Sequence, residues 1–172
     1  LGRHLGPDQP VYAFRASGIE PGEPIHEDVP AMAAHYITEI LGRQSRGRFQ
    51  LGGHSSGGAI AYELARQLLH RGMEVSSVFV MDTAPLPLSM RGIQVKQPED
   101  LLILAAHFKE RAPKAWEGFV ASVMEGSPFR QISLVHAQAF SAYPPGRSRV
   151  PLVYIRARER DEVLEPHAES WW

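Results

Sequence analysis

Residues 49–72 read FQLGGHSSGGAIAYELARQLLHRG and contain the spacing Gly-x-Ser-x-Gly, formed by Gly53, Ser55 and Gly57. Apolar residues lead into the glycines, which is typical of a short strand. After the glycines, apolar side chains recur at the spacing of one helical face, at Ala61, Leu64, Ala65 and Leu68. A serine that joins a strand to an amphipathic helix at this spacing is predicted to be a nucleophile presented on a sharp turn.

Two further features of the turn support this interpretation. Gly53 and Gly57 are expected to provide clearance, because residues two before and two after the nucleophile must be small for the turn to pack. The helix that begins beside Ser55 directs its first amides toward the same point, so the Ser56 N–H is a candidate oxyanion donor. The alternative is a glycine-rich turn without chemistry.

The rest of the chain predicts an α/β fold. Strand character is expected at 11–14, 49–51, 75–81 and 150–155, and helical periodicity at 30–41 and 101–108, 116–124 and 132–140. Alternating strands and helices predict a mostly parallel sheet with flanking helices, on which ligands bind at the carboxyl ends of the strands. The helices between the last two strands predict a helical lid inserted at about 86–148, within one partial domain that spans residues 1–172.

A serine nucleophile needs a histidine base, and the base needs an acid to orient it. Asp82 follows the predicted strand 75–81, which places it at the same sheet edge as Ser55. Asp161 follows the last predicted strand and is the competing candidate. From topology alone, both remain open.

Composition limits the function classes. The formal net charge of −1 gives no electrostatic support for a nucleic-acid partner or an anionic membrane surface, and no apolar run has the length of a membrane span. The absence of cysteine excludes thiolate chemistry and disulfides, and the histidines lack the neighbours that a metal site requires. We expect a cytoplasmic protein without an intrinsic metal or cofactor. The start at Leu1, without methionine, predicts an excised segment of a longer protein.

Three stretches of the sequence resemble a known family. Residues 51–87 (LGGHSSGGAIAYELARQLLHRGMEVSSVFVMDTAPLP), 9–40 (QPVYAFRASGIEPGEPIHEDVPAMAAHYITEI) and 151–159 (PLVYIRARE) are similar to type I thioesterase domains that end modular polyketide synthases and nonribosomal peptide synthetases. The resemblance implies an α/β-hydrolase fold and favours Asp82 over Asp161 as the triad acid. It covers most of the chain outside residues 86–127, where the helical lid varies.

The chain departs from the family at both ends. No counterpart of the family's loop carrying the second oxyanion amide precedes Leu1, and the triad histidine is expected beyond Trp172. His167 is the weak alternative, because it lies in a predicted helix soon after the last strand. His54 is expected to point away from Ser55. We therefore expect this segment alone to be inactive and the longer parent domain to be active.

The resemblance implies a chain-releasing enzyme. Ser55 would accept an acyl or peptidyl chain from the phosphopantetheine arm of an upstream carrier protein in the same polypeptide, followed by hydrolysis or macrocyclisation. The alternatives are a stand-alone editing (type II) thioesterase, a general esterase of the same fold, and a noncatalytic binding module. A homodimer through apolar faces of the lid is a further possibility.

Overall fold

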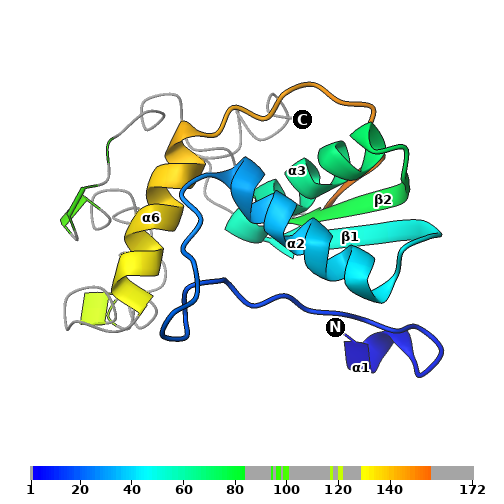
Figure 1. The fold of residues 1–172 in the computed structure, drawn as a ribbon, viewed down its shortest axis with the longest axis horizontal. Helices are drawn as coiled ribbons and strands as arrows, with labels where there is room; N and C mark the ends of the chain where they lie inside the picture. The colour runs from blue at the N-terminus through cyan, green and yellow to red at the C-terminus, as the bar shows by residue number, and fades with distance from the viewer. Residues whose placement is uncertain are drawn as a thin grey trace.

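The computed structural model describes residues 2–83, 94, 96–97, 99–100, 117, 120–121 and 129–155. Within these residues the chain forms a parallel sheet with the strand order β1-β2-β3, accompanied by helices (Figure 1). The elements are α1 (Gly2–Leu5), α2 (Val29–Arg43), β1 (Arg48–His54), α3 (Ser56–His70), β2 (Glu74–Met81), α6 (Phe129–Ala142) and β3 (Leu152–Ile155). The expected parallel α/β arrangement is confirmed.

Helix α2 begins where its sequence predicts. Asp28 is the N-cap, and its side chain accepts a hydrogen bond from the Ala31 N–H at 2.6 Å. Pro30 lies in the first turn, where its missing N–H costs nothing. Capping satisfies an amide that has no acceptor inside the helix, and this sets the start of α2.

Parallel pairing brings the carboxyl ends of the strands to one edge of the sheet. β1 pairs with β2 so that His54 lies opposite Met81, and β2 pairs with β3 so that Met81 lies opposite Ile155. The residues that directly follow β1 and β2 therefore leave the sheet side by side. This register positions the candidate site.

The core lies between the sheet and two helices. Helix α3 contacts both β1 and β2, and α2 packs along α3 (Figure 1). Deeply buried side chains come from α2, α3 and β2: Val29, Met32, Ala33, Ile37, Ala59, Leu64, Ala65, Leu68, Val78 and Val80. Because α3 is buried against both the strands and α2, its position and the turn that precedes it are strongly constrained.

The predicted strand at 11–14 is wrong, since these residues carry no strand pairing. Tyr12 is 62% exposed, and Phe14 instead packs its ring against Tyr36 at a centroid distance of 5.0 Å. A β-prone run forms a strand only when a neighbouring strand offers hydrogen bonds. Among the described residues, the sheet places no strand beside this run.

The region between β2 and β3 is described mainly through α6. This helix confirms the helix expected at 132–140, whereas the helices expected at 101–108 and 116–124 fall mostly outside the described residues. Across the described ranges, every helix is too short or too polar to cross a lipid bilayer.

Candidate active site

Ser55 lies in a strained turn between β1 and α3. Its backbone has φ 54° and ψ −126°, a conformation that residues with a side chain rarely adopt. The Ser55 N–H donates to the Met81 carbonyl at 2.9 Å, and the serine side chain makes no hydrogen bond that caps α3. Ser55 is exposed. Strain that the surrounding structure maintains is characteristic of functional residues.

Of the two glycines expected to provide clearance around Ser55, the structure bears out Gly53 and not Gly57. A Cβ atom at Gly53 would overlap the carbonyl group of Gly57, so Gly53 must be a glycine. A Cβ atom at Gly57 would meet nothing within 4 Å, whereas one at Gly58 would overlap the Thr83 hydroxyl. The expectation that the Gly57 position needs a small side chain for clearance is therefore wrong. The backbone at Gly57 fills the space beside Gly53, and the close approach after the serine lies at Gly58.

Asp82 leaves the sheet beside Ser55. It directly follows Met81, which pairs with His54, and its N–H donates to the Ile155 carbonyl at 2.8 Å. Its φ is 47°. Among residues 2–83 and the other described positions, Ser55 and Asp82 are the two residues other than glycine with a positive φ. Strain thus marks the same two residues that were predicted as nucleophile and acid.

The start of α3 provides the candidate oxyanion donor. Ser56 is the first residue of α3, so its N–H has no acceptor inside the helix. The N-terminal end of a helix also carries partial positive charge, which favours a developing anion. The arrangement can therefore present a hydroxyl and an amide donor at one exposed turn.

The structure describes some of the remaining candidate residues and not others. Asp161 and His167 fall outside the described residues, as does Trp172, after which the triad histidine is expected. His54 is exposed at the end of β1. His136 lies on α6, where burial, with a smaller contribution from the charge of His26, lowers its pKa.

No group of three or more metal-binding side chains that could hold an ion occurs within the described part of the chain.

Thr83, which was not predicted as a site residue, lies directly behind the turn. Thr83 is 3% exposed, and its hydroxyl donates to the Ser55 carbonyl at 2.7 Å. The only signal in the sequence is its position next to Asp82. The contact joins residues from two strand ends and therefore depends on the tertiary fold.

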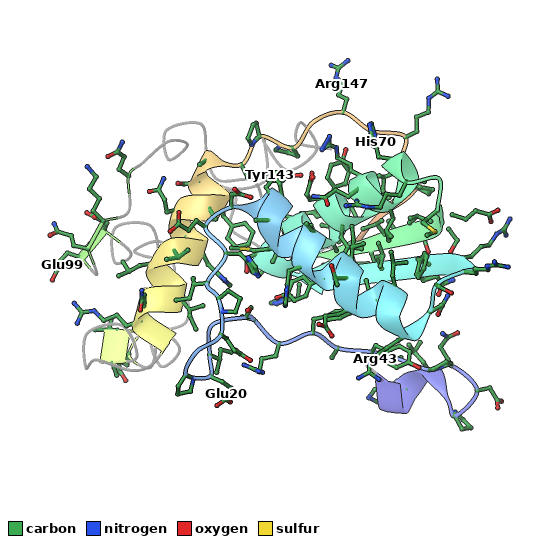
Figure 2. All side chains as sticks on the ribbon, in the orientation of Figure 1. Glu20, Arg43, His70, Glu99, Tyr143 and Arg147 are labelled. Atoms are coloured by element: carbon green, nitrogen blue, oxygen red, sulfur yellow. The ribbon has the colours of Figure 1, made fainter. Side chains whose placement is uncertain are left out.

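A buried polar cluster in the middle of α3 was also missed. The Glu63 carboxylate accepts hydrogen bonds from Arg66 at 2.8 Å, Gln67 at 3.0 Å and the Tyr143 hydroxyl at 2.8 Å. Tyr143 directly follows α6 (Figure 2), and its hydroxyl contacts Glu63 on α3. Burial, together with the hydrogen bond to Glu63, raises the pKa of Tyr143. The helical spacing of Glu63, Arg66 and Gln67 was visible in the sequence, but the contact with Tyr143 was not.

Helix α3 is also joined to the segment after α6 by a second hydrogen bond, from the Tyr62 hydroxyl to the Gly146 carbonyl at 2.8 Å. The two tyrosine contacts together fasten residues 143–146 to the helix that follows Ser55.

Comparisons with known proteins identify the family of this chain. The family profile described as "Thioesterase domain" matches residues 1–111. The atromentin synthetase nps3 of Serpula lacrymans var. lacrymans (strain S7.9) is 35% identical over 85 residues, covering 49% of this chain and 9% of that protein. The non-reducing polyketide synthase CTB1 of Cercospora beticola is 38% identical over 80 residues, covering 46% of this chain and 4% of that protein. The chain therefore spans a small part of the length of these relatives.

Solved structures confirm the fold. The four-domain nonribosomal peptide synthetase holo-AB3403 aligns with a TM-score of 0.61 at 25% identity, covering 86% of this chain and 13% of that one. The NocB thioesterase domain from the nocardicin cluster aligns with a TM-score of 0.56 at 21% identity, covering 79% of this chain and 53% of that one. The type II thioesterase BorB from the borrelidin biosynthetic cluster aligns with a TM-score of 0.58 at 20% identity, covering 84% of this chain and 59% of that one. With its sheet, its strained serine turn and a family profile that covers most of its length, this chain belongs to the thioesterase domain family.

Proposed function

We propose that this chain is the chain-releasing thioesterase region of a polyketide or nonribosomal peptide assembly line in the cytoplasm. The single observation that carries the proposal is the strained Ser55 turn, with Asp82 leaving the adjacent strand at the same sheet edge. A synthetase and a polyketide synthase among the relatives support the assembly-line setting. In that setting the substrate arrives on the phosphopantetheine arm of an upstream carrier protein.

The proposed reaction has two halves. In the first, the Ser55 Oγ attacks the thioester carbonyl carbon while a base takes its proton, and the new oxyanion receives a hydrogen bond from the Ser56 N–H. Collapse of this intermediate breaks the C–S bond, and the proton passes from the base to the departing thiol. An acyl ester on Ser55 remains.

In the second half, water or a nucleophile within the chain attacks the ester carbonyl. The same base takes the proton from the attacking group and returns it to the Ser55 Oγ as the C–O bond breaks. Water releases a free acid, whereas an internal hydroxyl or amine releases a macrocycle. We assign Asp82 to orient the base and place the base itself on a histidine that follows Trp172 in the parent protein.

Labelling with a fluorophosphonate probe tests the nucleophile. The 172-residue chain and a form extended past Trp172 are treated with the probe, and adducts are located by intact mass and peptide mapping. We expect labelling of Ser55 in the extended form, lost in Ser55→Ala and retained in Ser56→Ala. Rapid labelling of the 172-residue chain would show that a base lies within it, and labelling at another serine would refute the proposal.

Two matched substitutions test the acid. In the extended form we expect Asp82→Asn to abolish rapid labelling and Asp161→Asn to leave it unchanged, because only Asp82 is assigned to the base. The reverse pattern would transfer the role to Asp161.

The substrate class is tested separately. Turnover of an acyl group on a carrier protein, compared with the same acyl group on a simple ester, distinguishes a thioesterase from a general esterase. Preference for the simple ester would contradict the assembly-line role. Preference for acetyl carriers over long acyl carriers would favour the editing alternative, which the fold shared with BorB also permits.

A further inference from the structure

Thr83 holds the backbone of the candidate nucleophile from behind. Its hydroxyl lies 2.7 Å from the Ser55 carbonyl oxygen and 3.2 Å from the Met81 carbonyl oxygen. A hydroxyl has one proton to donate, so the shorter contact with Ser55 is the stronger hydrogen bond. Thr83 is buried, and water therefore does not compete for this bond.

The Ser55 carbonyl belongs to the same peptide group as the candidate oxyanion donor. The peptide bond between Ser55 and Ser56 is planar, and no peptide bond in the described residues is cis. In a trans peptide the C=O and the N–H point in opposite directions. A hydrogen bond that holds the Ser55 carbonyl inward therefore aims the Ser56 N–H outward.

Thr83 holds this turn through a hydrogen bond from its side chain. The turn also has backbone bonds, from the Ser55 N–H to the Met81 carbonyl at 2.9 Å and from the Gly58 N–H to the Ser55 carbonyl at 3.0 Å. Such backbone bonds use no side-chain group. The side-chain bond depends on the residue at position 83.

The absence of a side chain at Gly58 leaves room for Thr83. A Cβ atom at Gly58 would overlap the Thr83 Oγ1 and lie 2.8 Å from the Thr83 Cβ and 2.9 Å from the Val80 Cγ1. The hydroxyl therefore occupies a space that a side chain on α3 would otherwise fill. The close fit restricts Thr83 as well as the turn.

From these contacts we propose that Thr83 is a positioning residue, whose hydroxyl orients the Ser55–Ser56 peptide and thereby aims the Ser56 N–H at the oxyanion. This proposal rests on the proposed function of Ser55 as nucleophile. Thr83 touches neither substrate nor reacting atoms. It acts through the backbone of the residue that does.

Paired substitutions test the proposal. Thr83→Val keeps the shape of the side chain and removes the hydroxyl, whereas Thr83→Ser keeps the hydroxyl. Thr38→Val is the matched control, because the Thr38 hydroxyl also donates to a backbone carbonyl, that of Ala34 at 3.3 Å, but on the exposed side of α2. Each variant is made in the 172-residue chain and in the form extended past Trp172.

Two readouts are measured. Amide hydrogen exchange at Ser55 and Gly58, whose N–H groups hold the turn, reports on the backbone without requiring activity. Saturation kinetics of a fluorophosphonate probe report on the oxyanion site, because the phosphoryl oxygen takes the place of the oxyanion. For Thr83→Val we expect about tenfold faster exchange and about a tenfold lower maximal rate of labelling, with unchanged half-saturation. Thr83→Ser should restore both, and Thr38→Val should change neither.

The outcomes separate this proposal from the proposed function. Unchanged exchange at Ser55 and Gly58 in Thr83→Val would overturn the role of Thr83, whatever the labelling shows. Equal losses in Thr83→Ser and Thr83→Val would also overturn it, because the hydroxyl would then be irrelevant. Faster exchange in Thr83→Val without labelling of Ser55 in any form would refute the proposed function and retain Thr83 as the group that holds the turn.

Discussion

The start and the middle of α3 treat polar groups in opposite ways. At the start, Ser55 is exposed, its backbone is strained, and its side chain makes no cap to the helix. In the middle of the helix, Glu63 is 4% exposed and accepts hydrogen bonds from three side chains. The polar groups in the middle of the helix are buried and hydrogen-bonded, whereas its start carries backbone strain of the kind that is common at functional sites.

The difference shows how one helix serves both purposes. The Glu63 cluster joins α3 to Tyr143 after α6, and the Gln67 side chain also donates to the Pro30 carbonyl of α2 at 2.9 Å. A helix that is fastened at its middle keeps its first turn in place. The strain at Ser55 can then persist, because relaxation of the turn would have to move a helix that is held elsewhere.

The largest effect is expected at the glycine behind the turn. Gly53→Ala should lower the free energy of unfolding by about 3 kcal/mol, because its Cβ would overlap the Gly57 carbonyl and the turn would have to shift. Gly57→Ala is the control and should be neutral or stabilising, since its Cβ meets nothing. Urea unfolding of both variants measures the difference, and equal effects would show that the turn is freely deformable.

Removal of the buried carboxylate should have the next largest effect. Glu63→Ala leaves the Tyr143 hydroxyl buried without an acceptor and should cost about 2 kcal/mol. Glu39→Ala, which removes an exposed acid from α2, should change stability little. Thermal and urea unfolding measure both. A loss as small as that of Glu39→Ala would mean that the cluster does not stabilise the fold.

The pH dependence of the cluster follows from Tyr143. Tyr143→Phe should cost about 1.5 kcal/mol near neutral pH, because it removes a hydrogen bond to a carboxylate. The folded pKa of Tyr143 lies above its ordinary value of 10.0, so its contribution is complete below about pH 10 and is lost as the pH rises beyond it. The alkaline decline in stability should therefore be shallower in Tyr143→Phe than in Tyr12→Phe, which alters an exposed ring. Identical alkaline curves would contradict this assignment.

Relief of the backbone strain at the start of α3 should stabilise the protein. Ser55→Gly should raise the free energy of unfolding by about 1 kcal/mol, since glycine adopts φ 54° without strain. Ser56→Gly, one residue later inside the helix, should lower it instead. Urea midpoints of the two variants give the comparison. Destabilisation by Ser55→Gly would remove the argument that the turn is kept strained for function.

The smallest effect concerns an exposed carboxylate. Glu23 accepts hydrogen bonds from Arg15 and from the Gly18 and Glu20 amides, and these contacts lower the pKa of Glu23 to about 2. Its contribution is present above its ordinary pKa of 4.5 and disappears as the pH falls toward 2. Glu23→Gln should therefore flatten acid unfolding in this range slightly more than Glu27→Gln does. Matching acid curves would show that an exposed carboxylate, unlike Glu63, contributes nothing measurable.

Some of the fold could be predicted because its signals are local. The start of α2 at Asp28, the strand ending at Met81 and the strand-to-helix turn at Ser55 each depend on a few neighbouring residues. The expected strand at 11–14 failed for the opposite reason, since a strand needs a partner and β propensity alone provides none. The catalytic roles of Ser55 and Asp82, the oxyanion role of the Ser56 N–H, the triad base and the alternative acid Asp161 stay predictions.

The sequence by itself determined the candidate site residues and their placement. These are a serine between glycines, an aspartate at the end of the next strand, and a parallel order of strands that brings both to one edge of the sheet. Only the tertiary structure decided which glycine is indispensable, that Thr83 lies behind Ser55, and that Glu63 meets Tyr143. The physical reason is the distance along the chain over which each kind of interaction acts. Periodicity and capping act within a few residues, whereas close packing and buried hydrogen bonds join residues that are distant along the chain and meet only when the fold is complete.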